Sequence, residues 1–326
     1  MLSPRSILSF GLMLLGGNAV FGQPSSTGSA QIYPHKPVRL VTTEPGGGSD
    51  FVARLIAQGL SASFGQQVIV DNRPGGVVPG ETTAKAPPDG YTMLLSGGIV
   101  WLLPSMRTKV PWDPIRDFLP VTIATTAPTI LVVQSSIAAN NVKELIALLR
   151  SRPGELNYSS AGAAGASHLA AELFKSMTGV NIVWVPYKGN GPALNALLSG
   201  EVQLTFAPSG LVLSHVKAGK LRALGVTSAQ PSALAPELPT IAASGVPGYE
   251  SQSTLGIFVP ARTPTAVVNR LNQEIVKVLH DASARQKLLN AGVEAVGSTP
   301  AQLATMVKSE MIRMGNVIKN AGIRAD

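Results

Sequence analysis

The sequence predicts a mixed α/β fold whose strands are mostly parallel. Short apolar runs rich in β-branched residues alternate with longer runs of helical periodicity, which is typical of helices layered on a parallel sheet. One such apolar run, 38–43, ends in a glycine-rich turn, and a helical pattern begins directly after that turn. Changes of pattern near residues 127 and 249 indicate that the chain crosses twice between two lobes.

The individual elements follow from periodicity and from the turn residues that bound them. The expected strands are 38–43, 67–70, 91–95, 121–124, 129–134, 156–159, 182–186, 202–206, 221–227 and 255–259. Helices are expected after Asp50, Val142, Ser167, Gly191, Pro264 and Thr299. Ser49 or Asp50 is placed to cap the first of these helices, Ser167 to cap the third, and Thr299 with the following proline to open the last.

Composition excludes several classes of protein. The chain has 326 residues, of which 45% are hydrophobic and 13% charged, enough for a large core in one or two domains. The net charge is +8, but lysine and arginine are scattered singly and aromatic residues make up 5%, so nucleic acid is not an expected partner. The absence of cysteine excludes disulfides, thiolate metal sites and a cysteine nucleophile.

The N-terminal residues have the pattern of a secretory signal. Arg5 precedes an apolar stretch, 7–21, and small residues at Val20 and Gly22 allow cleavage after Gly22. A membrane anchor is the alternative, but the stretch is short for a span of about 20 residues and glycines interrupt it. We therefore expect residues 1–22 to be a signal peptide, 23–31 a flexible leader, and the mature protein to be periplasmic.

The two crossings predict a hinged body of two lobes with a cleft between them. Residues 32–126 and 250–326 are expected to form one lobe, and residues 127–249 the other. Clefts of this kind close on ligands.

Catalytic patterns are weak. No G-x-S-x-G elbow is present, and the four histidines do not form the spacings of a metal site. The enzyme hypothesis that these residues allow is a serine hydrolase that uses Ser160 or Ser167 with His168. We expect no cofactor, no metal and no catalysis.

Three glycine- and hydroxyl-containing loops instead favour binding. Each follows an expected strand: 43–50, 96–98 and 160–165. Ligands of α/β proteins bind beyond the carboxyl ends of strands, where backbone N–H groups and helix N-termini favour anions such as carboxylates. Glycine lets the backbone approach a ligand closely.

At these residues the chain resembles the periplasmic receptors of tripartite tricarboxylate transporters, the Bug-type receptors. The resemblance runs from Tyr33 to Ile323, and its short motifs occur in the family's order and spacing. They are Pro45-Gly-Gly47 with Asp50, Val70-Asp-Asn-Arg-Pro-Gly-Gly76, Pro88-Asp-Gly-Tyr-Thr92, Ser167-His-Leu-Ala-Ala-Glu-Leu-Phe174, Val185-Pro-Tyr-Lys-Gly189 and Lys217-Ala-Gly-Lys-Leu-Arg-Ala-Leu224.

The resemblance implies a two-lobed, type II-like periplasmic binding protein that works as a monomer. It would capture a small organic acid or amino-acid-like solute and deliver it to a two-component membrane permease; a sensor that reports solute to a signalling partner is the alternative. The residues expected to hold the ligand lie in the three loops and at two further strand ends. They are Thr43, Glu44, Gly46, Gly47, Ser49, Asp50, Ser96, Gly97, Gly98, Ile99, Ala161, Gly162, Ala163, Ala164, Gly165, His168, Tyr187 and Ala207.

Departures from the family pattern concern the solute. Glu44 stands where the family is apolar, while Ile99, Gly165 and Ala207 replace polar side chains that members often carry. If Glu44 faces the cleft, it favours a ligand with an amine or amide group. If Glu44 turns to solvent, the ligand is an ordinary mono- or dicarboxylate. In either case, citrate is a poorer candidate here than in a typical member.

Overall fold

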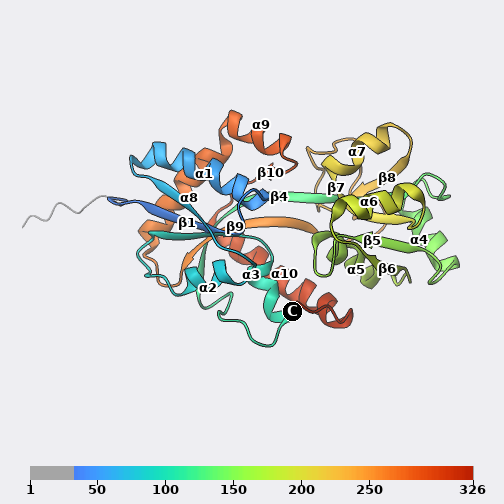
Figure 1. Cartoon of the computed structure of the whole chain (residues 1–326), viewed down its shortest axis with the longest axis horizontal. Helices are drawn as coiled ribbons and strands as arrows, with labels where there is room; N and C mark the ends of the chain where they lie inside the picture. Colours follow the sequence, from blue (N-terminus) through green and yellow to red (C-terminus); the bar gives the residue numbers. More distant parts are fainter. Residues whose placement is uncertain (1–32, 326) are drawn as a thin grey trace, which may run out of the picture. The chain divides into compact units, whose positions relative to one another are not determined.

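Strand β4 (Phe118–Gln134) joins two sets of strands and organises the fold (Figure 1). The computed structural model describes residues 33–325, so the signal peptide and leader predicted above lie outside the described residues. Within 33–325, no helix combines the length and the apolar character needed to cross a membrane.

The elements follow one another mostly as strand, helix, strand. The strands are β1 (Val38–Thr42), β2 (Val68–Asn72), β3 (Thr92–Ser96), β4, β5 (Asn157–Ser160), β6 (Val183–Pro186), β7 (Leu204–Pro208), β8 (Leu221–Val226), β9 (Gln252–Pro260) and β10 (Glu294–Ala295). The helices are α1 (Gly48–Phe64), α2 (Val78–Ala84), α3 (Ile99–Met106), α4 (Val142–Ser151), α5 (Ala166–Thr178), α6 (Asn190–Ser199), α7 (Ser209–Lys217), α8 (Thr265–His280), α9 (Ala282–Asn290) and α10 (Pro300–Asn320).

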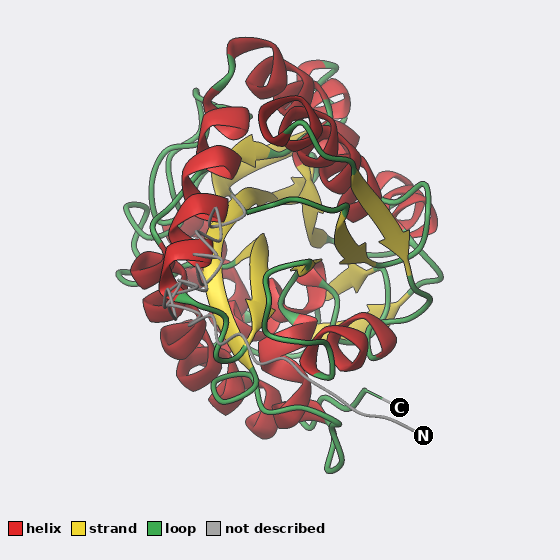
Figure 2. Ribbon diagram, turned by 90° about the vertical axis from the view of Figure 1, so that its left-hand side faces the viewer, coloured by secondary structure: helices red, strands yellow, loops and turns green. Residues whose placement is uncertain are grey.

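Strand pairing divides the described chain into two halves that share β4. In the first half, β1 pairs in parallel with β2 and β3, and β9 lies antiparallel between β3 and β4. In the second half, β5 pairs in parallel with β6 and β7, while β7 and β8 lie antiparallel to β4. We call these the β1 half and the β5 half. Figure 2 shows helices surrounding the strands, as the alternating pattern predicts.

The sequence predicted two strands, 121–124 and 129–134, where the structure has one. β4 runs unbroken for 17 residues, so the predicted break between 124 and 129 is wrong. The reason is visible at Pro128, which is the last β4 residue paired with β9, while Thr129 is the first paired with β7. A proline, which has no N–H to donate, is tolerated where the strand changes partners.

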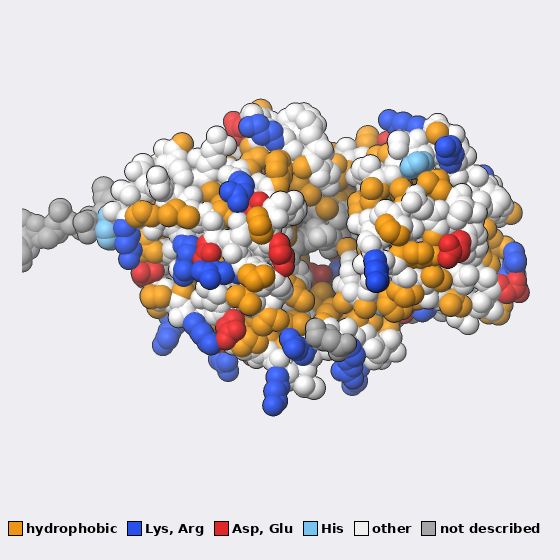
Figure 3. Space-filling view, in the orientation of Figure 1, with side chains coloured by type: hydrophobic (Ala, Val, Ile, Leu, Met, Phe, Trp, Pro, Cys, Tyr) orange, Lys and Arg blue, Asp and Glu red, His pale blue; other side chains and the backbone are white. Residues whose placement is uncertain are grey.

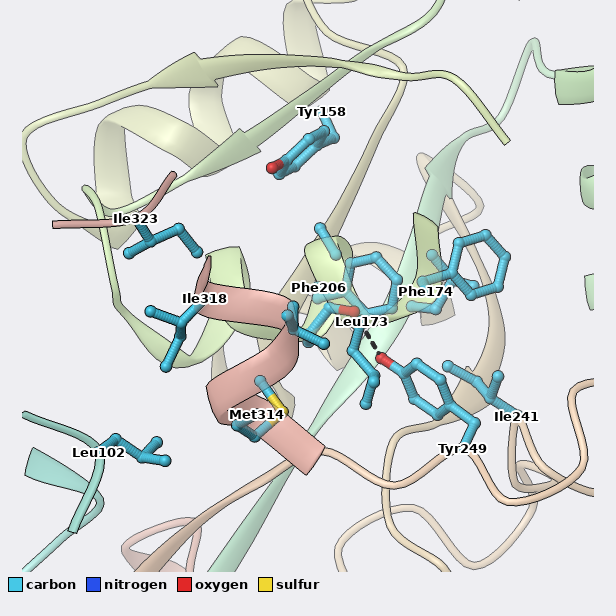
Figure 4. Packing of buried hydrophobic residues seen from close by; sticks show 14 of the residues in the cluster. Leu102, Tyr158, Leu173, Phe174, Phe206, Ile241, Tyr249, Met314, Ile318 and Ile323 are labelled. Atoms are coloured by element: carbon cyan, nitrogen blue, oxygen red, sulfur yellow. Dashed lines mark hydrogen bonds between the residues drawn. The ribbon is translucent and has the colours of Figure 1, made fainter. Parts of the chain in front are cut away.

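Burial on both faces of the strands explains their continuous apolar character. In β4, Leu131 and Val133 face one core cluster, while Ile130 and Val132 face another. The first of these clusters extends through both halves, since it holds Leu94 of β3 as well as Phe174 and Phe206 of the β5 half. Met314 and Ile318 of α10 pack in the same cluster (Figure 4). The C-terminal helix α10 thus contributes to a core that reaches both halves.

Two predicted helix caps are wrong, and one is confirmed. Helix α1 begins at Gly48 with Gly47 as its N-cap, and α5 begins at Ala166 with Gly165 as its N-cap, so neither Ser49, Asp50 nor Ser167 is a cap. Thr299 does cap α10, through a complete capping box with Gln302. The difference matters below, because glycine caps leave the N–H groups of the first turn without a side-chain acceptor.

Candidate functional site

Several helices that follow strands begin without side-chain caps. This holds for α1, α3, α5 and α7, which follow β1, β3, β5 and β7 and whose N-caps are Gly47, Gly98, Gly165 and Pro208. Helices α4, α9 and α10, by contrast, are capped by the side chains of Asn141, Asp281 and Thr299. The uncapped N-termini lie at the carboxyl ends of strands in both halves, and they favour anions there.

Asp50, in the first turn of α1, is hydrogen-bonded to the loop after β1. Its side chain is 7% exposed. Its Oδ2 accepts hydrogen bonds from Gly46 N at 2.9 Å and Arg54 Nε at 3.0 Å, and its Oδ1 accepts one from Asn72 Nδ2 at 2.9 Å. These donors, Arg54 foremost, lower the pKa of Asp50 to about 2. The predicted site residue Asp50 therefore positions the loop.

Glu44 is exposed and bridges two loops. Its Oε1 accepts a hydrogen bond from the backbone N–H of Gly75, in the loop after β2, at 2.5 Å. Hydrogen bonding, first from its own backbone N–H and then from Gly75, lowers the pKa of the Glu44 carboxyl. Glu44 is thus an ionised carboxylate at the surface of the loop after β1, with the loop after β2 as its partner.

The loop after β3 and the start of α3 pack closely against the loop after β2 and against β9. A Cβ on Gly76 would lie 2.8 Å from Ile99 Cγ1, and a Cβ on Gly97 would lie 3.3 Å from the carbonyl oxygen of Thr254. Ser96 is 1% exposed, and its Oγ has no hydrogen-bond partner within the described chain. The predicted residues of the loops after β1 and β3 are therefore brought together through the loop after β2.

In the β5 half, aromatic rings support the loop after β5. The indole of Trp184 stacks on the imidazole of His168, and Trp184 Nε1 donates to Ser160 Oγ at 2.8 Å. Ser160 Oγ in turn donates to the carbonyl of Gly162, and His168 Nδ1 accepts from Ala164 N at 3.2 Å. Burial lowers the pKa of His168, which keeps the ring neutral and able to accept this bond.

These bonds bear on the hydrolase alternative. Among the described residues, no hydrogen bond joins His168 to Ser160 or Ser167, and the only acceptor nitrogen of a neutral His168 is already bonded to Ala164 N. A serine nucleophile needs that nitrogen as its base. His168 and Ser160 instead shape a loop of small residues.

The remaining predicted residues lie at strand ends of the β5 half. Tyr187 N donates to the Ser160 carbonyl at 3.0 Å, but the Tyr187 hydroxyl is bonded to Glu201 Oε1 at 2.8 Å. Ala207 is buried near the end of β7, just before the uncapped start of α7. Sequence reasoning missed Trp184, although a tryptophan in a strand that leads to a predicted site loop was a usable signal.

The predicted residues therefore form two groups, one in each half. The surface is hollowed near the middle of the view in Figure 3, over the region where β4 and β9 run side by side between the two halves in Figure 1. Groups of N–H donors on two α/β halves that are joined by paired strands are typical of the class of two-lobed α/β solute-binding proteins.

The comparisons agree with this class. The model of the "Tripartite tricarboxylate transporter family receptor" matches residues 52–323, and the chain belongs to this family of periplasmic substrate-binding receptors. Among curated relatives, the protein BugT of Bordetella pertussis is 33% identical over 301 residues, which cover 91% of this chain and 92% of BugT. The family predicted from the motifs is confirmed.

Solved structures of similar proteins share the fold. The R. palustris protein Rpa4515, solved with adipate, is 37% identical, with a TM-score of 0.70 and coverage of 90% of this chain and 99% of that one. MatC of Rhodopseudomonas palustris, solved with bound malate, is 27% identical, with a TM-score of 0.67 and coverage of 88% and 100%. The predicted α/β binding-protein fold is confirmed.

Proposed function

We propose that this chain is an exported receptor that captures a small carboxylate between two lobes and delivers it to a two-component membrane permease. The observation that carries the proposal is the set of uncapped helix N-termini after β1, β3, β5 and β7. Their N–H groups suit a carboxylate, and they occur in both halves. The adipate and malate found with two similar proteins are carboxylates and support the same class of ligand.

Capture would work by closure of two lobes on the ligand. One lobe is formed by residues 32–126 and 250–326, and the other by residues 127–249. The change of β4 partners at Pro128 and the start of β9 at Gln252 support hinges near these boundaries. A ligand shifts the balance between open and closed forms only if it binds the closed form more tightly. N–H donors from both halves would supply that difference.

A binding screen tests the proposal. The protein beginning at Gln23 would be melted with mono-, di- and tricarboxylates and with the neutral amide of each. A ligand that binds only the folded protein raises its melting temperature, by an amount that grows with ligand concentration. We expect a shift with at least one carboxylate and none with its amide. Equal shifts with acid and amide, or none with any acid, would contradict carboxylate capture.

Closure, export and delivery need separate measurements. Small-angle scattering should show a smaller radius of gyration when the ligand is bound. The chain recovered from the periplasmic fraction should have the mass of a protein that begins at Gln23. Deleting the gene should abolish high-affinity uptake of the ligand, whereas loss of a solute-induced transcriptional response with intact uptake would favour the sensor alternative.

A further inference from the structure

The loops after β1, β3, β5 and β7 contain no lysine or arginine. In residues 42–50, 96–99, 160–167 and 207–210 the charged residues are Glu44 and Asp50, both acidic. Asp50 is compensated by Arg54, through a contact of 3.0 Å. Glu44 is bonded to a backbone N–H rather than to a cation. Backbone N–H groups and neutral hydroxyls, such as that of Ser96, are therefore the donors that these loops offer to an anion, and Glu44 adds a negative charge beside them.

Glu44 also occupies a donor that a ligand could have used. Its Oε1 lies 2.5 Å from Gly75 N, in a glycine loop that packs on Ile99 at the start of α3. Glu44 thus places a carboxylate of the protein itself among the loops after β1, β2 and β3. A second ligand carboxylate near these loops would meet that like charge and would find Gly75 N already bonded.

Arg73 and Lys188 are the basic residues in the neighbouring loops after β2 and β6. Arg73 Nε lies 2.9 Å from Asp71 Oδ1, and Asp71 also lies 3.6 Å from Arg39, so Arg73 is paired with a carboxylate that it shares with Arg39. Lys188 is exposed after β6, which is the outermost strand of the β5 half. Among the described residues, neither Arg73 nor Lys188 forms an ion pair with Glu44.

Several side chains near the starts of the helices that follow strands are apolar and at least partly exposed. Phe51, in the first turn of α1, and Val78, which begins α2, are each 40% exposed. Ile99 begins α3 and is partly exposed, and the loop after β5 presents Ala161 and Ala163. Burying a ligand's hydrocarbon against apolar surface of this kind makes the free energy of binding more favourable. Burying a ligand hydroxyl there without a hydrogen-bond partner makes it less favourable.

We propose that the site selects a solute with one carboxylate and an apolar body, and that Glu44 is the residue that disfavours a second carboxylate. This inference rests on the proposed function, since it names the class of solute for the same site. The helix N-termini bind the single carboxylate, and Phe51, Val78 and Ile99 cover the hydrocarbon.

Four ligands, three of them with six carbons, test the selection by calorimetry at pH 7.5 and low salt. They are hexanoate, adipate, malate and hexanamide. Hexanoate and adipate share a six-carbon chain and differ by one carboxylate, so their ratio isolates the second charge. We expect hexanoate to bind about 10-fold more tightly than adipate, malate to bind more weakly than adipate, and hexanamide not to bind.

Glu44→Gln removes the charge but keeps a group able to accept from Gly75. This variant should raise the affinity for adipate about 10-fold and change the affinity for hexanoate less than about 3-fold. Glu155→Gln is the matched control, because Glu155 is an exposed partner of Arg152 outside the site loops; it makes the same change in net charge and should alter neither affinity.

The outcomes separate this inference from the proposed function. Adipate that binds the unaltered protein as tightly as hexanoate would overturn the selection and leave carboxylate capture intact. Equal gains for both acids in Glu44→Gln would show a general charge effect and would overturn the role of Glu44. If neither acid binds, and no other acid of the screen binds, both proposals fail. The comparison in the unaltered protein decides the selection even if the variant does not fold.

Discussion

The indole of Trp184 lies almost flat against the imidazole of His168, with ring centroids 4.0 Å apart and 11° between the ring planes. Trp184 comes from β6 and His168 from the first turn of α5, and both are bonded to the loop between β5 and α5. This pair supports a loop whose own side chains are mostly alanine or absent. The loop's geometry therefore depends on two residues that lie outside it.

Removing the indole should loosen the loop after β5. We expect Trp184→Ala to weaken binding of the carboxylate by about 10-fold and to lower the free energy of unfolding by about 1–3 kcal/mol, because a stacked ring and the bond to Ser160 are both lost. Hydrogen exchange in residues 160–165 should accelerate. Trp184→Phe keeps a ring but not the N–H and should give intermediate values; unchanged exchange in both variants would contradict this role.

Stability should fall as the pH is lowered through the range in which histidine titrates. Burial, opposed by Glu172 and reinforced by Lys175, holds the pKa of His168 below its ordinary value near 6.5 in the folded protein. The unfolded chain therefore binds a proton more readily, and stability present above about pH 6.5 is lost below it. Protonation also removes the acceptor for Ala164 N, so ligand affinity should fall with it.

The variant His168→Asn tests this pH dependence. Asparagine can still accept from Ala164 N but does not titrate. We expect its melting temperature to be lower than that of the unaltered protein at pH 7.5, and the gap to narrow by pH 5.5. If the difference in melting temperature between the two proteins stays constant from pH 7.5 to pH 5.5, groups other than His168 cause the pH dependence.

Asp50 should stabilise the protein above pH 4. Its pKa of about 2 lies below the value near 3.9 of an unfolded aspartate, so its contribution is present above about pH 4 and is lost as the pH falls towards 2. The shift corresponds to about 2–3 kcal/mol, and the exposure of Arg54 makes this an upper figure. In urea unfolding, Asp50→Asn should cost about 1–2 kcal/mol at pH 7 and less at pH 3. A constant cost at both pH values would show that charge is not the cause.

The contact between Gly76 and Ile99 should tolerate no added methyl group. A Cβ at position 76 would lie 2.8 Å from Ile99 Cγ1, so Gly76→Ala should lower the free energy of unfolding by about 1–3 kcal/mol and move the start of α3. Adding Ile99→Ala should recover part of this loss, which a double-mutant cycle measures. Gly48→Ala is the control, because a Cβ there meets nothing within 4 Å. Additive effects of the two substitutions would argue against the contact.

Local patterns predicted much of the fold. The strand 38–43 corresponds to β1 (Val38–Thr42), and Thr299 caps α10 as its sequence indicates, since both depend on neighbouring residues alone. Helices α2, α3, α7 and α9 were not predicted, because each has nine residues or fewer and too few turns to show a periodicity. The unbroken β4 was also missed, since Pro128 is tolerated only through its place between two partner strands.

Local sequence was enough to predict where N–H donors lie, because glycine-rich turns after strands set the starts of helices. The sequence by itself also determined the family, through motifs spread along the chain. Tertiary structure decided what the side chains do. Asp50, which the sequence placed as a cap or ligand group, is bonded to Asn72, and Glu44 is bonded to Gly75, 31 residues away in the chain. Hydrogen bonds between loops depend on which strand ends lie side by side, and only the packing of the sheet sets that order.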